Sequence, residues 1–143
     1  MKKYLIVLFV AILPAIAFTS CSDDDEVAIT EANLIGKWNA VRSTGWEKED
    51  GAVVDQWNEK VSGITLEFNT NGTCSFDEDG DIVSGDWTID GNELFISFFD
   101  DGEEILIKQL TSNTLVISYY YKDDRPWHDY VSEEYIEFSF QRI

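Results

Sequence analysis

The feature that most constrains this chain is an alternation of apolar and polar residues between closely spaced turn signals. Ile64, Leu66 and Phe68 alternate with Thr65 and Glu67, and the same pattern recurs further along the chain. Such alternation places apolar side chains on one face of a β-strand and polar side chains on the other. The sequence therefore predicts sheets with one buried and one solvated face.

Turn signals divide the chain at regular intervals. Asn-Gly or Asp-Gly pairs, which accept the positive φ of tight hairpin turns, begin at residues 50, 71, 79, 90 and 101, and a Ser-Asn pair begins at 112. No stretch is suited to a helical crossover, so the strands should form an antiparallel meander. Nine strands are expected, at residues 37–46, 53–60, 63–69, 73–77, 82–89, 93–99, 104–110, 114–121 and 134–142.

A meander of this length can stay open or close on itself. Closure removes the unpaired edges that invite aggregation. We therefore expect an all-β fold, an antiparallel up-and-down meander closed into a barrel of about eight strands, with one of the nine as an irregular edge. A two-sheet sandwich is the alternative.

Composition excludes several classes of function. The chain has 28 acidic and 10 basic residues among 143, and its net charge of −18 repels nucleic-acid phosphates. One histidine and two cysteines cannot complete a closed zinc site or a scaffold of several disulfides. An apolar fraction of 44% is enough for a packed core. We expect one domain stabilised by apolar burial, with no nucleic-acid partner.

The N-terminus has the features of an export signal. Two lysines precede an apolar run over residues 4–18, which is shorter than a membrane-spanning helix and ends in small residues before Cys21. The segment Phe18-Thr19-Ser20-Cys21 resembles the lipobox of bacterial lipoproteins, with Phe18 where an aliphatic residue is usual. The resemblance implies that the chain is cut before Cys21 and that a lipid is attached to its thiol.

An acidic run follows Cys21 directly, over residues 22–26. It resembles the sorting signal that sends lipoproteins of some Gram-negative bacteria to the cell surface. We expect a signal peptide at 1–20, an acidic tether at 21–30 and the barrel at 31–143. The predicted location is the outer membrane, lipid-anchored and exposed at the cell surface. With Cys21 acylated, Cys74 has no disulfide partner and is expected to be a buried apolar residue.

The segment Leu34-Ile35-Gly36-Lys37-Trp38 resembles the opening of lipocalins, where a short helical turn leads into Gly-x-Trp. The resemblance implies that Trp38 closes one end of the barrel, with an arginine from the last strand across it. Arg142 shares its strand face with Phe140, so it is the expected arginine. Residues 87–94 and 107–115 are similar to segments of the lipocalin-like domains of small bacterial lipoproteins, and the resemblance covers 34–143.

Residues suited to catalysis or metal binding are few. His128 is followed by Asp129, but no nucleophile or oxyanion site accompanies it, so a polar loop role is expected. Residues 77–81 carry acids at alternate positions, as calcium loops do, but strands flank them. A solvated hairpin is expected there, and weak calcium binding stays open. We expect no enzyme activity and no cofactor, which agrees with the mostly non-catalytic class of the resemblance.

Aromatic residues near one barrel end are the candidates for recognition. Trp127 and Tyr130 lie in the long segment before the last strand, and Trp46 and Trp57 lie on the first hairpin. Their rings either contact a ligand or merely cap the barrel. We predict non-catalytic binding of a small, largely apolar ligand. The alternative is a filled barrel that serves as a protein or glycan interaction module in an envelope complex. A connected cavity of roughly 300 Å³ would favour the ligand.

Overall fold

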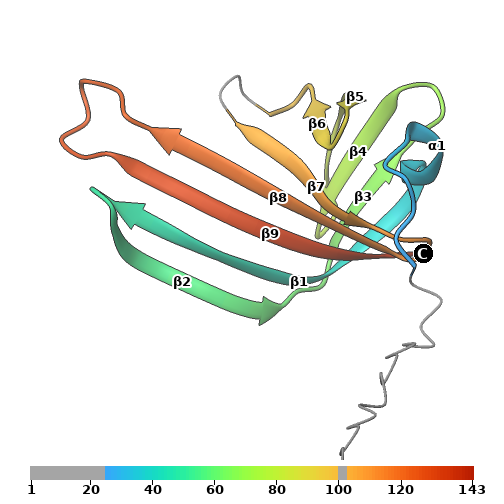
Figure 1. Ribbon diagram of the computed structural model, residues 1–143, viewed down its shortest axis with the longest axis horizontal. Coiled ribbons are helices and arrows are strands. Elements are labelled where there is room, and N and C mark those ends of the chain that lie inside the picture. The colour runs from blue at the N-terminus through green and yellow to red at the C-terminus, as the bar shows by residue number, and fades with distance from the viewer. Residues whose placement is uncertain (1–24, 100–102) are drawn as a thin grey trace, which may run out of the picture.

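The computed structural model describes residues 25–99 and 103–143. The predicted signal peptide and Cys21 lie outside these described residues. One short helix precedes nine strands (Figure 1). The elements are α1 Glu31–Leu34, β1 Gly36–Glu49, β2 Ala52–Lys60, β3 Ile64–Phe68, β4 Thr73–Glu78, β5 Asp81–Asp90, β6 Glu93–Ile96, β7 Glu104–Leu110, β8 Thr114–Asp123 and β9 Ser132–Arg142.

Eight of the strands form a closed antiparallel ring. Each of β3 to β8 pairs with the next strand along the chain, while β1 pairs with β3 on one side and with β9 on the other. The first and last strands are therefore joined, over a ladder that runs from Trp38 and Arg142 to Glu49 and Ser132. The predicted all-β meander closed into an eight-stranded barrel is confirmed, and the sandwich alternative is wrong.

Strand β2 is the ninth strand, and it lies outside the ring. One edge of β1 is shared: residues 36–39 pair with β3, and residues 42–49 pair with β2. The β1–β9 register shifts between Ala40 and Arg42, where β1 has one extra residue, and the β1–β2 register shifts between Glu47 and Lys48, where β2 has one. β2 thus continues the sheet beyond the barrel wall and is the irregular edge that the turn spacing predicts.

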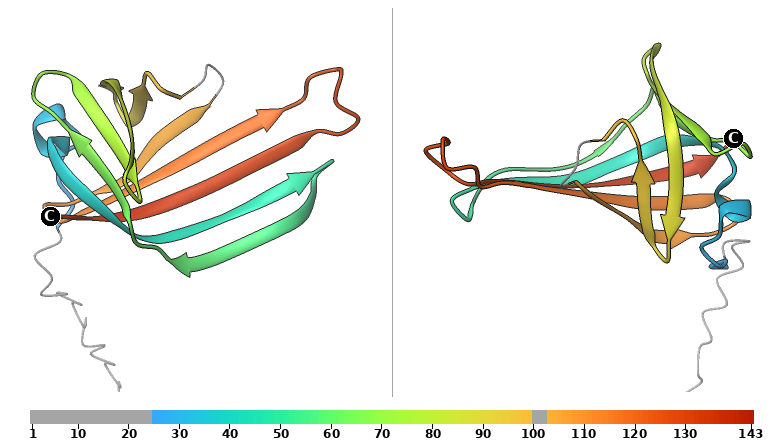
Figure 2. Two further views of the ribbon diagram at one scale, coloured as in Figure 1. Left: turned by 180° about the vertical axis from the view of Figure 1, so that it is seen from behind. Right: turned by 90° about the horizontal axis from the view of Figure 1, so that it is seen from above.

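Four strands extend the sheet past the barrel. β2, β1, β9 and β8 run on as a long, slightly twisted layer, while β3 to β7 and α1 gather at the other end of the molecule (Figures 1 and 2). We call this layer the four-stranded extension. The tips of its two hairpins are tied together, since Asp50 N–H donates to Val131 O at 2.8 Å and Val131 N–H donates to Asp50 Oδ1 at 2.9 Å.

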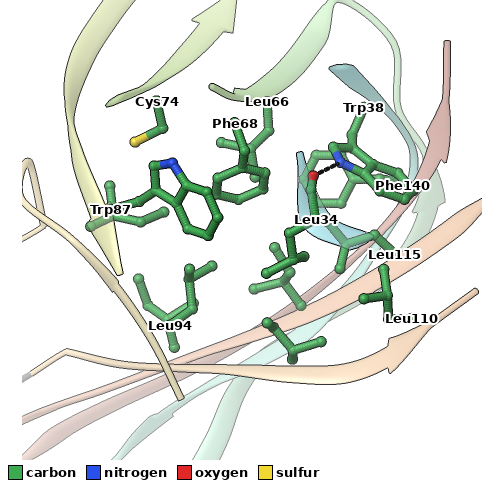
Figure 3. Packing of buried hydrophobic residues seen from close by; sticks show 14 of the residues in the cluster. Leu34, Trp38, Leu66, Phe68, Cys74, Trp87, Leu94, Leu110, Leu115 and Phe140 are labelled. Carbon is green, nitrogen blue, oxygen red and sulfur yellow. Dashed lines mark hydrogen bonds between the residues drawn. The ribbon is translucent and has the colours of Figure 1, made fainter. Parts of the chain in front are cut away.

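The hydrophobic core fills the closed end of the barrel. Trp38, Leu66, Phe68, Trp87 and Phe140 come from four different strands and are buried together (Figure 3). The ring centroids of Phe68 and Trp87 are 4.9 Å apart, in a tilted arrangement. The alternation read from the sequence places each of these side chains on the inner face, as expected.

Two of the predicted hairpin turns have the backbone that their sequence favours. Asp50 and Gly51 both have positive φ, at 49° and 81°, and so do Asp79 and Gly80, at 52° and 97°. Aspartate and glycine tolerate this conformation better than other residues. The predicted turn at Asp101-Gly102 lies outside the described residues.

Strand β6 ends earlier than predicted. It stops at Ile96 instead of continuing to 99, because the chain turns there and Phe99 N–H donates to Ile96 O. Its ladder with β7 consists of one residue pair, Glu93 with Leu106. β6 and β7 are therefore joined by fewer paired residues than any other two neighbouring strands of the ring.

The predicted tether is attached to the barrel over part of its length. Glu26 forms a bridge with Thr111, and Val27 N–H donates to Leu110 O at 2.9 Å. Val27 and Ile29 pack against the core. Folded structure thus begins several residues before the expected boundary at 31. No helix in the described part of the chain is long and apolar enough to span a membrane.

Candidate ligand-binding site

The closed end of the barrel is built around Trp38. Its indole is fully buried, and its Nε1–H donates to Leu34 O in α1 at 2.9 Å (Figure 3). Thr30 caps α1 by accepting from Asn33 N–H. The single helical turn thus seals the core at this end, with buried Leu34 beneath it.

Arg142 holds the closed end together from outside. Its guanidinium carbon lies 4.1 Å from the centroid of the Trp38 ring, which is the contact implied by the resemblance and by strand parity. The same group donates to the backbone oxygens of Ser112, Ile35 and Asn33 at 2.7 to 2.8 Å. One side chain therefore links the first strand, the helical turn and the β7–β8 turn.

Gly36 makes room for this guanidinium. A Cβ atom at Gly36 would lie 2.6 Å from Arg142 Nη1, and the φ of Gly36 is 131°. Few residues other than glycine adopt that conformation. The predicted group of Gly36, Trp38 and Arg142 is thus assembled at one end of the barrel, away from the four-stranded extension.

An apolar cavity of about 370 Å³ lies between this core and the four-stranded extension. Side chains from the inner faces of strands β3 to β9, and from the turn after β6, line it. The lining residues are Leu66, Phe76, Val83, Leu94, Ile96, Phe98, Phe99, Ile105, Ile117, Tyr119, Glu134, Ile136, Phe138 and Phe140.

The cavity has a closed floor and an open mouth. Leu66, Ile117 and Phe140 are buried and form part of the floor. Val83 and Phe99 line it with exposures of 47% and 37%. Solvent and small molecules can therefore reach the apolar interior without disruption of the core.

Gly85 allows the turn after β6 to cover part of the cavity. A Cβ atom at Gly85 would lie 2.4 Å from Ser97 Oγ and 3.0 Å from a ring carbon of Phe98. The Phe98 ring is 5.1 Å from that of Phe99, which in turn is 5.9 Å from Tyr119. Because the turn after β6 can approach Gly85 closely, the rings of Phe98, Phe99 and Tyr119 follow one another along one wall of the cavity.

One carboxylate lies in the cavity wall. Glu134 of β9 pairs with Glu47 of β1 and with Tyr121 of β8. Burial raises the pKa of Glu134 above its usual range, and the negative charges of Glu47 and Glu103 raise it further. Glu134 is therefore harder to ionise than an exposed glutamate.

Tyr119 lies beside this carboxylate. Its hydroxyl donates to Glu103 Oε1 at 2.9 Å. Burial raises the pKa of Tyr119, and the hydrogen bond to Glu103 raises it further. The phenol therefore stays neutral near pH 7, and it gives this part of the wall a fixed polar group.

The four aromatic residues predicted to bind a ligand lie away from the cavity. Trp46 stacks on Tyr135, with ring centroids 5.8 Å apart, on the opposite face of the sheet. Trp57 lies over Gly45 and donates from Nε1 to Ser43 Oγ at 3.0 Å. None of these side chains, nor Trp127 or Tyr130, lines the cavity, so their binding role stays a prediction.

Trp127 and Tyr130 lie in the loop between β8 and β9, at a tip of the extension. Their exposures are 71% and 45%. Arg125 lies over the Trp127 ring, with its guanidinium carbon 5.4 Å from the ring centroid. These rings form a solvent-facing surface instead of a cap on the barrel.

Asp123 fixes the base of the same loop. Arg125 donates to both of its carboxylate oxygens, which lowers the pKa of Asp123 to about 2. His128 Nε2 lies 3.6 Å from Asp123 Oδ2. The loop histidine therefore lies beside the Asp123–Arg125 ion pair at the extension tip and is not among the cavity-lining residues.

The acidic turn at 77–81 has a local structural role. Asp77 Oδ1 accepts from Gly80 N–H at 2.9 Å, and Asp79 N–H donates to Gly63 O. No group of three or more metal-ligating side chains occurs among residues 25–99 and 103–143. Within that part of the chain, these contacts give no support to a cation site.

Cys74 is buried at 1% exposure on the inner face of β4, as expected. Burial raises the pKa of its thiol to about 11, and the charge of Asp86 adds to the effect. A thiol of this kind is a poor nucleophile at neutral pH.

A second hollow of about 620 Å³ lies along β5, β6 and β7, where β6 and β7 share a single ladder pair. Asp86, Glu93, Glu103 and Glu104 are among its lining residues. Its walls are more polar than those of the first cavity. The smaller, apolar cavity is therefore the better candidate site.

Sequence reasoning missed Glu134, Tyr119 and Phe99 as cavity residues. The sequence did contain a signal for Glu134: it is two residues from Ile136 and four from Phe138, so all three side chains point to the inner face of β9. Phe99 carried no such signal, because its position depends on the turn that ends β6.

Comparison with protein families agrees with this architecture. A family model described as a lipocalin-like domain matches residues 34–117. No curated protein matches the chain. A solved structure from Nostoc punctiforme, a protein of unknown function from the DUF3598 family, is similar with 10% identity and a TM-score of 0.38. The match covers 85% of this chain and 51% of that one, so this chain spans about half of its length.

Proposed function

Because this chain belongs to the lipocalin-like domain family, we propose that it is a non-catalytic binding protein for a small, largely apolar molecule. The lipocalin-like barrel is a fold of the ligand-binding type. The observation that carries the proposal is the open apolar cavity of about 370 Å³. Ligand sites are typically apolar cavities of about 300–1,000 Å³ with a few polar groups.

The residues of the wall support this function over that of a filled barrel. Apart from Tyr119 and Glu134, all lining residues have purely apolar side chains. Removal of apolar surface from water favours binding of an apolar guest. A cavity of this size accommodates a guest such as a decyl chain or a small ring system.

The test is binding of decanol by the full chain, measured by displacement of a fluorescent apolar probe. The variant Ile136→Trp places a bulky ring in the cavity wall and is expected to abolish binding. Ile82→Trp is the matched control, because Ile82 is 65% exposed and lies outside the cavity. Equal binding by both variants, or no binding by the parent chain, would contradict the proposal.

We further propose that the protein is anchored in the outer membrane by a lipid on Cys21 and is exposed at the cell surface. The lipobox-like segment and the acidic residues after it support this location. Labelled palmitate should be incorporated by the parent chain and not by Cys21→Ala. Protease added to intact cells should digest the protein, whereas protection until lysis would contradict surface exposure.

A second candidate function is a protein or glycan interaction module. The exposed rings of Trp127 and Tyr130 at the extension tip favour it. Exposed aromatic residues are typical of such binding surfaces. Trp127→Ala should then weaken binding of the partner without affecting decanol binding, and loss of decanol binding in this variant would contradict the separation of the two sites.

A further inference from the structure

The cavity is mostly apolar, and the one ionisable carboxylate or amine that the described residues place in its wall is acidic. Its lining includes the carboxylate of Glu134 and no lysine, arginine or histidine among the described residues. The two ion-pair contacts among residues 25–99 and 103–143 both involve Asp123, at the extension tip. Glu134 therefore lies in the wall without a basic partner in the described part of the chain.

Two further carboxylates near Glu134 add to the negative charge at this part of the wall. Glu47 lies opposite Glu134 in the β1–β9 ladder, and Glu103 accepts the hydrogen bond of Tyr119 beside it. An anionic guest would meet repulsion at this part of the wall. A cationic guest would instead be attracted, and the chain's net charge of −18 adds to that attraction at longer range.

Aromatic rings flank the same part of the wall. Phe99 and Tyr119 have ring centroids 5.9 Å apart, and both line the cavity together with Glu134. Aromatic faces attract ammonium groups, and a carboxylate supplies the opposite charge. The combination of rings, one carboxylate and an apolar interior suits a molecule with an apolar body and a cationic head.

We propose that the cavity selects apolar amines, with the alkyl or ring portion in the interior and the ammonium group against Glu134, Phe99 and Tyr119. This inference rests on the proposed function and adds the chemical class of the ligand. The raised pKa of Glu134 is consistent with it, because a bound cation would restore the ionised form that burial disfavours.

The test compares three probes with the same chain and different heads: decylamine, decanol and decanoate. An alkylamine is protonated near pH 7, as a lysine side chain is. The full chain should bind decylamine at least roughly tenfold more tightly than decanol, since hydrogen bonds to charged groups are the stronger ones. Decanoate should bind most weakly.

Variants then assign the preference to one residue. Glu134→Gln should remove the preference for decylamine over decanol and improve decanoate binding. Glu67→Gln is the matched control, because it makes the same change in net charge on β3 outside the cavity. It should keep the parent preference, and thermal unfolding of both variants checks that the fold is intact.

The outcomes separate this inference from the proposed function. Decanol binding with no preference for decylamine, or a preference that Glu134→Gln leaves unchanged, would overturn the inference and leave the proposed function standing. Failure of all three probes to bind would overturn the proposed function itself. Equal loss of preference in both variants would mean that general charge, and not Glu134, attracts the amine.

Discussion

Trp57 of β2 lies directly over Gly45 of β1, where an added Cβ atom would be 2.4 Å from the indole Cζ2. The two residues are partners in the β1–β2 ladder. Trp57 also donates to Ser43 Oγ from its Nε1. This contact holds β2, which is outside the ring of eight strands, against β1 within the four-stranded extension.

Gly45→Ala should loosen the extension. The new methyl group would also lie 2.4 Å from Tyr135 O, so β2 or β9 must shift. Overpacking of this kind costs about 1–3 kcal/mol. Unfolding in urea should show that loss, and tryptophan fluorescence should shift toward the emission of solvent-exposed indole. Thr44→Ala, one residue away on the opposite face, should change both measurements little.

Arg142→Lys should destabilise the closed end although it keeps the positive charge. A lysine cannot make the three backbone hydrogen bonds of the guanidinium fork or stack as a planar group on Trp38. We expect a loss of about 2 kcal/mol in the free energy of unfolding. Arg42→Lys, at an exposed position on β1, is the control; an equal loss there would argue against a special role for Arg142.

Glu134→Gln should stabilise the protein at neutral pH. The pKa of Glu134 is raised in the folded state, so its ionised form opposes folding at pH values above the usual range of glutamate. As pH falls through the raised pKa, the parent chain regains this stability. The difference between parent and variant, measured by thermal unfolding, should therefore shrink as pH falls through the raised pKa of Glu134 toward the ordinary glutamate value of 4.5. A gap that widens on acidification would contradict the assigned environment.

Asp123→Asn should act in the opposite direction. The pKa of Asp123 is lowered from 3.8 to about 2 by the Arg125 guanidinium, so its ionised form supports the fold above pH 3.8. This support is lost as pH falls toward 2. The variant should be less stable than the parent near pH 7 and should approach it in acid. NMR titration of the Asp123 carboxyl carbon gives the pKa directly, and a midpoint near 4 would contradict the assignment.

Much of the barrel could be predicted because its signals are local. Alternation gave the inner residues of β3 and β9, and paired Asp-Gly residues gave the turns at 50 and 79. Trp38 and Arg142 followed from the resemblance together with strand parity. These features depend on residues close in sequence or on one strand period.

The binding site depends on relationships that no local pattern contains. The early end of β6 comes with the turn after Ile96, which places Phe98 close to Gly85 and decides where Phe99 lies. The volume left by large side chains is a property of their packing, so Leu94 and Ile96 could be assigned inward without showing whether space remains. Trp57 was predicted at the barrel mouth, but β2 leaves the ring and takes it onto the extension.

The position of α1 opposite the hairpin tips determines how an anchored molecule would be oriented. Glu26 to Ile29 run along the α1 end of the barrel, and the tips at Asp50 and Val131 lie at the other end (Figure 1). The four residue-to-residue steps from Cys21 to Asp25 can bridge at most about 14 Å. A lipid on Cys21 would thus keep the Trp38 end near the bilayer, and Trp127 would stand outermost, where molecules in the surrounding medium would meet it first.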